Sequence, residues 1–196
     1  MIKRLFDIKC SFLGLIILSP LFLLIAIIIV IDSKGGIFFR QKRVGKYEKL
    51  FILYKFRTMV RDAEAKGPLT LSHRDGRITK PGRFLRKYKL DELPQLINVL
   101  TGNMSMVGPR PEVPKYVALY NEEQKKVFRV KPGITDYASI AFAGENELLA
   151  KSADPETTYT EKIMPAKLKL ALKYIEDQSL LTDLRIIGKT LLKILR

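Results

Sequence analysis

The chain has 196 residues, of which 47% are hydrophobic, so it has room for one domain of ordinary size with a real core and for a membrane segment. Lys and Arg number 35 against 20 acidic residues, and the net charge of +15 must face nucleic acid, anionic lipid or a phosphorylated substrate. This composition excludes a disordered polycation, and the sequence shows neither the interleaved aromatic residues nor the reading helix of a nucleic-acid binder.

Cysteine and histidine are too scarce for a cross-linked or zinc-bound protein. The single cysteine, Cys10, cannot form an intramolecular disulfide, which suits a reducing cytoplasmic compartment. The single histidine, His73, lies in a polar stretch without a second ligand type at metal-binding spacing. We therefore expect neither a disulfide framework nor a zinc site.

The first predicted element is an apolar helix that a proline interrupts. Residues 10–31 contain no charged side chain, and as a straight helix of 22 residues they would measure about 33 Å and could just cross a bilayer core. Ser19-Pro20 lies near the middle of this run, where proline removes a backbone hydrogen bond and bends or breaks the helix. Each arm alone would then span about half of a bilayer.

Basic residues flank the apolar run on both sides. They are Lys3, Arg4 and Lys9 before it, and Lys34, Arg40, Lys42, Arg43 and Lys46 after it. The positive-inside tendency places both ends in the cytoplasm. A re-entrant helix that dips into one leaflet and returns at Ser19-Pro20 satisfies both observations. We predict it over residues 1–34, with a single spanning anchor as the alternative; a cleaved signal peptide fits less well, because no small-residue cleavage site follows.

Two extended segments are predicted next, at residues 37–44 and 49–59. Both are rich in Phe, Ile and Tyr, and a short stretch containing Gly45 joins them, so we expect a pair of strands. Alternation along the second segment places Lys55 and Arg57 on one face. Two neighbouring cations on a half-buried strand suit an oxyanion, and solvent-facing charges on an edge strand are an equal alternative.

Helices are predicted for most of the remaining chain. Residues 62–82 are polar and loop-forming, whereas residues 83–100 carry apolar side chains at mostly helical spacing, interrupted or restarted at Pro94. Residues 179–196 form a clearer amphipathic helix, which suits either an anionic membrane surface or packing on the domain. Its apolar stripe comprises Leu180, Leu184, Ile187, Leu191 and Ile194, opposite Arg185, Lys189, Lys193 and Arg196.

These elements together predict an α+β fold that is mainly helical. An N-terminal re-entrant membrane helix, broken at Ser19-Pro20, precedes a small cytosolic catalytic domain over residues 35–196. Amphipathic interfacial helices and a short strand pair make up that domain.

The acids of greatest chemical interest are the adjacent Asp91 and Glu92, in an apolar stretch beside Pro94. On a regular helix they would point about 100° apart, but a break at the proline could let them converge. An ionised carboxylate can act as a nucleophile at phosphorus or as a hard metal ligand. Salt bridging on a helix surface is the alternative, which the residues alone favour. The neighbouring cations, expected to favour ionisation, are Arg86, Lys87 and Lys89.

A rigid basic loop follows at residues 101–111. Arg110 lies between Pro109 and Pro111 after Gly108, so its backbone has little freedom and the direction of its guanidinium group is largely preset. Such a preorganised fork suits a pyrophosphate. The alternative is a rigid turn with a solvent-facing arginine.

Five motifs occur in a fixed order along the chain. They are KFRTM at 55–59, D-x-R-I-T at 75–79, LDELPQLINVL at 90–100, GNMSMVGPRP at 102–111 and KPGIT at 131–135. With the N-terminal Lys3-Arg4-x-x-Asp7 and Ser19-Pro20, this series resembles the bacterial sugar transferases called small monotopic phosphoglycosyl transferases. The resemblance extends to about residue 187.

The resemblance implies a reaction that begins at the acid pair. Asp91 would attack the β-phosphorus of a UDP-sugar, expel UMP and hold the phosphosugar covalently. Polyprenol phosphate would then displace it, giving a polyprenyl diphosphate-sugar. Mg²⁺ would assist at Asp91 and offset charge in the phosphoryl transition state, and Glu92 would position the metal or handle the proton.

The resemblance also implies substrate-binding residues and a place in the cell. Arg86 matches the arginine that receives the lipid phosphate, and Asp183, in a spacing from Tyr174 that resembles the family, is a further candidate. The residues expected around the nucleotide-sugar phosphates are Lys55, Arg57 and Arg110 with its flanking Pro109 and Pro111. The family is monotopic with cytoplasmic termini, so we expect the cytoplasmic face of a bacterial inner membrane and the first membrane step of glycan assembly.

One stretch departs from the family pattern. After KPGIT the family commonly continues G-L-A-Q-V, whereas residues 136–140 read DYASI, with Asp136-Tyr137 in place of Gly-Leu. If this loop faces the sugar, sugar or acceptor preference will differ. The sugar, the glycan pathway and any homo-oligomer stay open. The competing hypothesis is a membrane-anchored basic adaptor or nucleic-acid-binding protein, in which Asp91 and Glu92 only balance charge.

Overall fold

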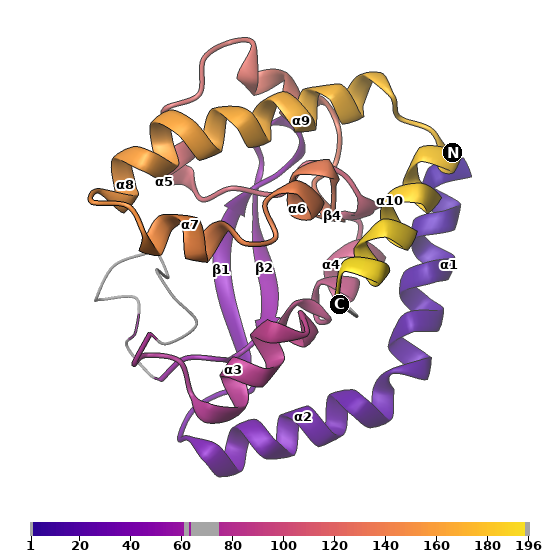
Figure 1. Cartoon of the computed structure of the whole chain (residues 1–196). Coiled ribbons are helices and arrows are strands. Elements are labelled where there is room, and N and C mark those ends of the chain that lie inside the picture. The colour runs from indigo at the N-terminus through magenta and orange to yellow at the C-terminus, as the bar shows by residue number, and fades with distance from the viewer. Residues whose placement is uncertain (1, 61–62, 64–74, 195–196) are drawn as a thin grey trace.

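The computed structural model describes residues 2–60, 63 and 75–194, so the expectation for His73 lies outside the described residues. The described part is mainly helical, with two small two-stranded sheets, as Figure 1 shows. This confirms the predicted mainly helical α+β composition and strand pair; the second sheet was not predicted. The α-helices are α1 (Ile2–Ile17), α2 (Ser19–Asp32), α3 (Lys80–Lys87), α4 (Gln95–Leu100), α5 (Pro114–Val117), α6 (Tyr137–Ala141), α7 (Glu145–Ala150), α8 (Pro155–Thr158), α9 (Met164–Glu176) and α10 (Leu180–Ile194). The strands are β1 (Phe38–Val44), β2 (Leu50–Phe56), β3 (Ser105–Val107) and β4 (Gly133–Thr135).

The two N-terminal helices form a bent pair. α1 and α2 lie at 61° to each other on either side of Leu18, and Pro20 stands in the first turn of α2. The Ser19 hydroxyl donates to the Ile16 carbonyl at 2.8 Å, which satisfies one acceptor beside the break. The predicted break is therefore confirmed. Among the described helices none is long and apolar enough to cross a bilayer alone, although this pair meets the same length and composition test together.

Much of the apolar surface of this pair is exposed. Phe12, Leu13, Ile27 and Ile31 are among the large apolar residues that remain exposed, at 48 to 80% of their surface. Figure 1 shows α1 and α2 running along two adjoining sides of the molecule. An apolar surface of this extent marks a contact with a membrane or a partner.

Polar side chains near the start of α1 attach it to the rest of the domain. The Asp7 carboxylate is 2% exposed and accepts hydrogen bonds from Ser105 Oγ and the Met106 backbone N, both at 3.0 Å. The Arg4 guanidinium donates to two carbonyl groups at the C-terminal end of α4, at 2.6 and 2.9 Å. Helix α1 is thus fixed to β3 and α4, the elements that follow the acid pair.

The predicted strand pair is an antiparallel hairpin. β1 and β2 pair in the register Phe38 with Phe56 through Val44 with Leu50. α4 is attached to β2 by the buried Asn98, whose Oδ1 accepts from the Tyr54 N at 3.0 Å and whose Nδ2 donates to a β2 carbonyl at 2.7 Å. These two hydrogen bonds of Asn98 hold the β2 edge beside the acid pair.

The segment at 83–100 is not one helix with a break at Pro94. α3 ends at Lys87, Lys89 adopts a left-handed φ of 55°, and a 3₁₀ turn over Leu90–Glu92 follows before α4. Pro94 then caps the start of α4, so the proline restarts a helix that had already ended. The left-handed conformation of Lys89 leads into the 3₁₀ turn, and both acids lie on that turn.

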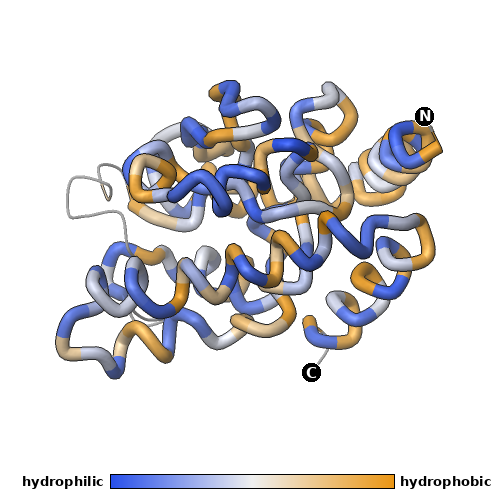
Figure 2. The backbone as a smooth tube through the Cα atoms, turned by 90° about the horizontal axis from the view of Figure 1, so that it is seen from above, coloured by the Kyte–Doolittle hydropathy of each residue, from blue (hydrophilic) through white to orange (hydrophobic). Residues whose placement is uncertain are grey.

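The C-terminal helix α10 presents two different faces. Ile186 is fully buried and Ile187 partly so, while Leu184 and Leu191 are more than half exposed. Figure 2 shows the alternation of apolar and polar residues along the helix that leads to the C-terminus. Packing on the domain is therefore confirmed for the face that carries Ile186, whereas the alternative of an anionic membrane surface stays a prediction for the exposed leucines.

Candidate active site

The site is centred on the 3₁₀ turn that carries the acid pair. Asp91 is 7% exposed and Glu92 9%, so both carboxylates lie inside the domain and not on a helix surface. The alternative of a salt-bridged pair on a helix surface is therefore wrong, because both acids lie inside the domain. Burial makes each charge costly unless it is compensated.

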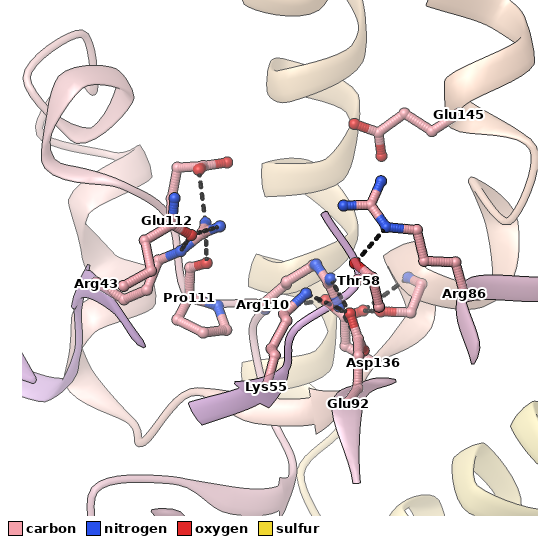
Figure 3. Close-up of polar contacts among 12 residues, drawn as sticks. Arg43, Lys55, Thr58, Arg86, Glu92, Arg110, Pro111, Glu112, Asp136 and Glu145 are labelled. Atoms are coloured by element: carbon pink, nitrogen blue, oxygen red, sulfur yellow. Dashed lines mark hydrogen bonds and ion pairs between the residues drawn. The ribbon is translucent and has the colours of Figure 1, made fainter. Parts of the chain in front are cut away.

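Cations from two distant segments compensate Glu92. Its Oε1 accepts from Lys55 Nζ of β2 at 2.8 Å and from Arg110 Nη2 at 2.5 Å, and its Oε2 accepts from Arg110 Nη1 at 3.3 Å, as Figure 3 shows. The Arg110 contact is thus a two-pronged fork of the kind that binds carboxylates strongly. Burial alone would raise the pKa of Glu92, but Arg110 and Lys55 outweigh it and hold that pKa well below its usual value. We call Lys55, Glu92 and Arg110 the Glu92 clamp.

Asp91 is in the opposite situation. Its Oδ1 is buried and has no hydrogen-bond partner among the described residues. Burial raises the pKa of Asp91, the neighbouring Glu92 charge adds to the increase, and Lys55, Lys89 and Arg86 offset it only in part. Lys89 and Arg86 thus favour ionisation of Asp91, as expected, but burial outweighs them and the net shift of its pKa is upward. For Glu92 the cations that prevail are Arg110 and Lys55, with a smaller contribution from Lys89.

Arg86 approaches the acid pair from α3. Its Nε donates to Thr58 Oγ1 at 2.9 Å, and its outer nitrogen atoms have no hydrogen-bond partner in the described part of the chain. Gly82 makes this approach feasible, since a Cβ there would lie 2.2 Å from the Thr58 carbonyl oxygen. Arg86 thus offers N–H groups beside the acids, and Thr58, which lies in the KFRTM motif but was not among the predicted site residues, sets their direction.

Two predicted substrate-binding residues lie elsewhere. The Arg57 guanidinium donates to the carbonyls of Ser33 and Lys34, both at 2.7 Å, at the C-terminal end of α2. The two predicted neighbours on β2 therefore have different partners: Lys55 binds Glu92, whereas Arg57 binds the carbonyls that follow α2. Arg57 thus supplies hydrogen-bond donors for carbonyls at the C-terminal end of α2.

Asp183 is enclosed in a separate polar network. It is 0% exposed, accepts from the Tyr174 hydroxyl at 2.7 Å and forms an ion pair with Lys3 of α1. Its carboxylate joins α1, α9 and α10, and the structure does not bring it to the acid pair. The spacing that suggested substrate binding corresponds here to a structural contact.

The backbone around Arg110 is held from three sides. Gly108 N donates to the Thr135 carbonyl at 3.1 Å, and Gly133 N donates to the Pro109 carbonyl at 3.0 Å. The Arg110 N donates to Asp136 at 3.3 Å. The alternative of a solvent-facing arginine is wrong, because its guanidinium group is bound to Glu92. A cavity of about 40 Å³ adjoins this loop, and Arg110 and Asp136 both line it.

The residues present fit a magnesium ion only in combination with a substrate. No group of three or more acidic, cysteine or histidine side chains within residues 2–60, 63 and 75–194 could form a metal cage. Magnesium, however, commonly binds one or two carboxylates together with substrate phosphates and water. The unpartnered Asp91 Oδ1 can supply such a ligand, whereas both Glu92 oxygens are already engaged.

A buried acid pair among cations, with one buried oxygen that lacks a partner in the described part of the chain, is typical of an enzyme that acts on an anionic substrate. The family described as Bacterial sugar transferase matches residues 1–196. The chain belongs to this family, so the predicted family membership and the predicted enzyme class are confirmed. This family membership excludes, as the main interpretation, a membrane adaptor or nucleic-acid-binding protein without catalysis.

Several relatives share this sequence over nearly all of the chain. One from Bacillus subtilis (strain 168), described as an uncharacterized sugar transferase, is 38% identical over 99% of this chain and 87% of its own length. A UDP-glucose:undecaprenyl-phosphate glucose-1-phosphate transferase of Escherichia coli (strain K12) is 36% identical over 98% of this chain and 40% of its own. A UDP-N-acetylgalactosamine-undecaprenyl-phosphate N-acetylgalactosaminephosphotransferase of Aeromonas hydrophila is 36% identical over 99% and 44%. The chain thus spans less than half of the latter two relatives.

Proposed function

We propose that this chain transfers a sugar phosphate from a UDP-sugar to undecaprenyl phosphate, with Asp91 as the nucleophile. The observation that carries the proposal is the buried Asp91 Oδ1, which has no hydrogen-bond partner among the described residues and lies beside a Glu92 whose two oxygens are engaged. The names of the E. coli and Aeromonas relatives, both of which specify undecaprenyl phosphate, support the reaction. They specify different UDP-sugars, so the sugar of this chain is left open.

The proposed reaction has two displacements at one phosphorus. An Asp91 oxygen attacks the β-phosphorus of the UDP-sugar, the bond to the bridging oxygen breaks, and UMP leaves with that electron pair. An oxygen of undecaprenyl phosphate then attacks the same phosphorus, which releases the Asp91 carboxylate and leaves an undecaprenyl diphosphate-sugar. Glu92 cannot easily serve as the nucleophile, because attack would break its bonds to Lys55 and Arg110.

Magnesium is part of the proposal because burial disfavours the ionised form of Asp91. Burial raises the pKa of Asp91, and a cation at the free oxygen would favour the carboxylate. When bound at Asp91 and the substrate phosphates, magnesium supplies charge compensation in the phosphoryl transition state. Lys55 and Arg110 lie close enough to contribute positive charge from the opposite side of the pair.

The lipid substrate would approach along the apolar side of the molecule. Arg86, whose outer nitrogens have no hydrogen-bond partner within residues 2–60, 63 and 75–194, is suited to receive the phosphate of undecaprenyl phosphate. The exposed apolar residues of α1, α2 and α10 would rest in the membrane, with α1 and α2 re-entrant and the domain on the cytoplasmic face of a bacterial inner membrane.

A donor panel tests the proposed function. The purified chain is incubated with Mg²⁺ and UDP-glucose, UDP-galactose, UDP-N-acetylglucosamine or UDP-N-acetylgalactosamine, without any lipid. One donor is expected to give UMP and to add the mass of its phosphosugar to the intact protein, and chelation of the metal with EDTA should stop both. If no donor yields UMP or added mass, the covalent route is wrong.

Labelling distinguishes the re-entrant from the spanning arrangement. In a Cys10→Ser background, Ile2→Cys is expected to react with a membrane-impermeant thiol reagent only after the cells are permeabilised, because both ends of a re-entrant pair face the cytoplasm. Glu122→Cys is the internal control, since the Glu122 side chain is 90% exposed on the catalytic domain. Equal labelling behaviour of the two cysteines supports re-entry, and opposite behaviour shows a spanning helix.

A further inference from the structure

Asp136 is a buried carboxylate for which the proposed reaction has no task. It is 1% exposed and lies between the end of β4 and the start of α6. Its Oδ1 accepts from Ser139 N at 2.7 Å and from Ser139 Oγ at 2.6 Å, so it caps α6. Its Oδ2 is directed to a different element and accepts from the Arg110 backbone N at 3.3 Å.

The second contact is informative because of the prolines around Arg110. Pro109 and Pro111 have no backbone N–H, so the Arg110 N–H is the single backbone donor in the Pro-Arg-Pro sequence. Asp136 is the acceptor for that donor. A helix cap needs only one carboxylate oxygen, and here the other oxygen fixes the orientation of the Arg110 peptide.

The orientation of this peptide bears directly on the acid pair. The Arg110 side chain forms the two-pronged contact with Glu92, at 2.5 and 3.3 Å. In Figure 3, Asp136, Arg110, Lys55 and Glu92 lie in one group, and the Asp136 carboxylate adds a negative charge beside the Arg110 guanidinium. A small rotation of the Arg110 peptide would move its guanidinium group away from Glu92.

We propose that Asp136 is a positioning residue, which acts through the Arg110 N–H to hold the Glu92 clamp in the geometry that binds the donor phosphates. This inference rests on the proposed function.

Asp136→Ser separates the two roles of the side chain. Serine is about as good a helix cap as aspartate, but its hydroxyl is too short to reach both Ser139 and the Arg110 N. We expect the melting temperature to stay close to that of the wild type, while kcat/KM for UMP release falls roughly ten-fold. In the Arg110→Ala background the same change should have almost no further effect, because the residue it positions is gone.

Hydrogen exchange at Arg110 gives a readout that needs no activity. Within residues 109–111 the backbone amide of Arg110 is the only one that can exchange, because proline has no backbone N–H. A peptide that contains these residues therefore includes a single exchangeable amide from the Pro-Arg-Pro sequence. Its exchange is expected to be faster in Asp136→Ser than in the wild type. Asp154→Ser is the matched control: Asp154 caps α8 through Glu156 N and Thr157 N, and it should leave UMP release and Arg110 exchange unchanged.

Three results would overturn the inference: unchanged Arg110 exchange in Asp136→Ser, UMP release within two-fold of the wild type, or effects that simply add to those of Arg110→Ala. A fall in activity that only follows a fall in melting temperature would also count against it. If the wild type releases no UMP from any donor, the proposed function fails, and exchange at Arg110 still decides whether Asp136 positions this residue.

Discussion

Replacement of Asp91 by asparagine is expected to lower the rate of UMP release by at least about a thousand-fold and to abolish the covalent phosphosugar. Asparagine keeps the shape of the side chain but has neither the negative charge nor the nucleophilic oxygen of a carboxylate. The change should appear for whichever UDP-sugar the wild type accepts, measured as UMP released and as mass added to the intact protein.

The same variant is expected to unfold at an equal or higher temperature than the wild type at neutral pH. Because burial raises the pKa of Asp91 in the folded state, ionising it at neutral pH opposes folding. This cost begins to shrink as the pH falls through the folded pKa and is gone below the pKa of the unfolded state, whereas asparagine removes it at every pH. Loss of activity with retained stability would separate a nucleophile from a structural acid.

The control for this experiment is Asp177→Asn, which changes an exposed aspartate after α9 and should leave UMP release unaffected. If Asp91→Asn still acquires the phosphosugar mass, another residue is the nucleophile, and the proposal for Asp91 is wrong.

Features encoded within a few residues could be predicted from the sequence. Pro20 bends the apolar helix whatever the rest of the fold is, because its ring removes a backbone N–H donor and clashes with the preceding turn. The alternation and the turn at Gly45 specify the β1–β2 hairpin in the same local way. The adjacent Asp91 and Glu92 stood out because acids are unexpected in a basic, apolar stretch.

Features that depend on distant partners could not be predicted in this way. Glu92 meets Lys55 and Arg110, which are 37 and 18 residues away along the chain, and no local pattern specifies either contact. The left-handed Lys89 that ends α3 is not a glycine, so the sequence carried no turn signal there. Burial of Asp91 then reversed the expected direction of its pKa shift, since exposure is a property of the whole fold.

Arg57 and Asp183 also show that contacts with distant residues cannot be predicted from a local motif. Both are charged residues in motifs that resemble the family, and both were expected near substrate. The structure gives each a different set of partners: the C-terminal carbonyls of α2 for Arg57, and Lys3 with Tyr174 for Asp183. A charged residue within a motif can serve the scaffold as well as the chemistry, and only its contacts distinguish the two.

Glu92→Ala is expected to be the most destabilising single change at the site. It would leave Lys55 and Arg110 facing each other inside the domain without their shared counter-charge, which typically costs about 3 to 5 kcal/mol in the free energy of unfolding. For a chain of this size the melting temperature should fall by roughly 6 to 20 °C. Thermal unfolding measures this, and Glu122→Ala, which removes an exposed partner of Lys125, should change it little.

Acid titration of the Glu92→Gln variant distinguishes the charge of Glu92 from its hydrogen bonds. Glutamine can still accept from Lys55 or Arg110, so the loss relative to the wild type measures mainly the missing charge. Since the clamp holds the folded pKa of Glu92 well below its usual 4.5, the charge stabilises the fold above that usual value. The difference between the two proteins should therefore stay constant from about pH 7 to pH 5 and shrink only as the pH falls further. A difference that was already shrinking near neutral pH would mean that Glu92 is not held ionised, and then neither Lys55 nor Arg110 could owe its place beside Asp91 to this carboxylate.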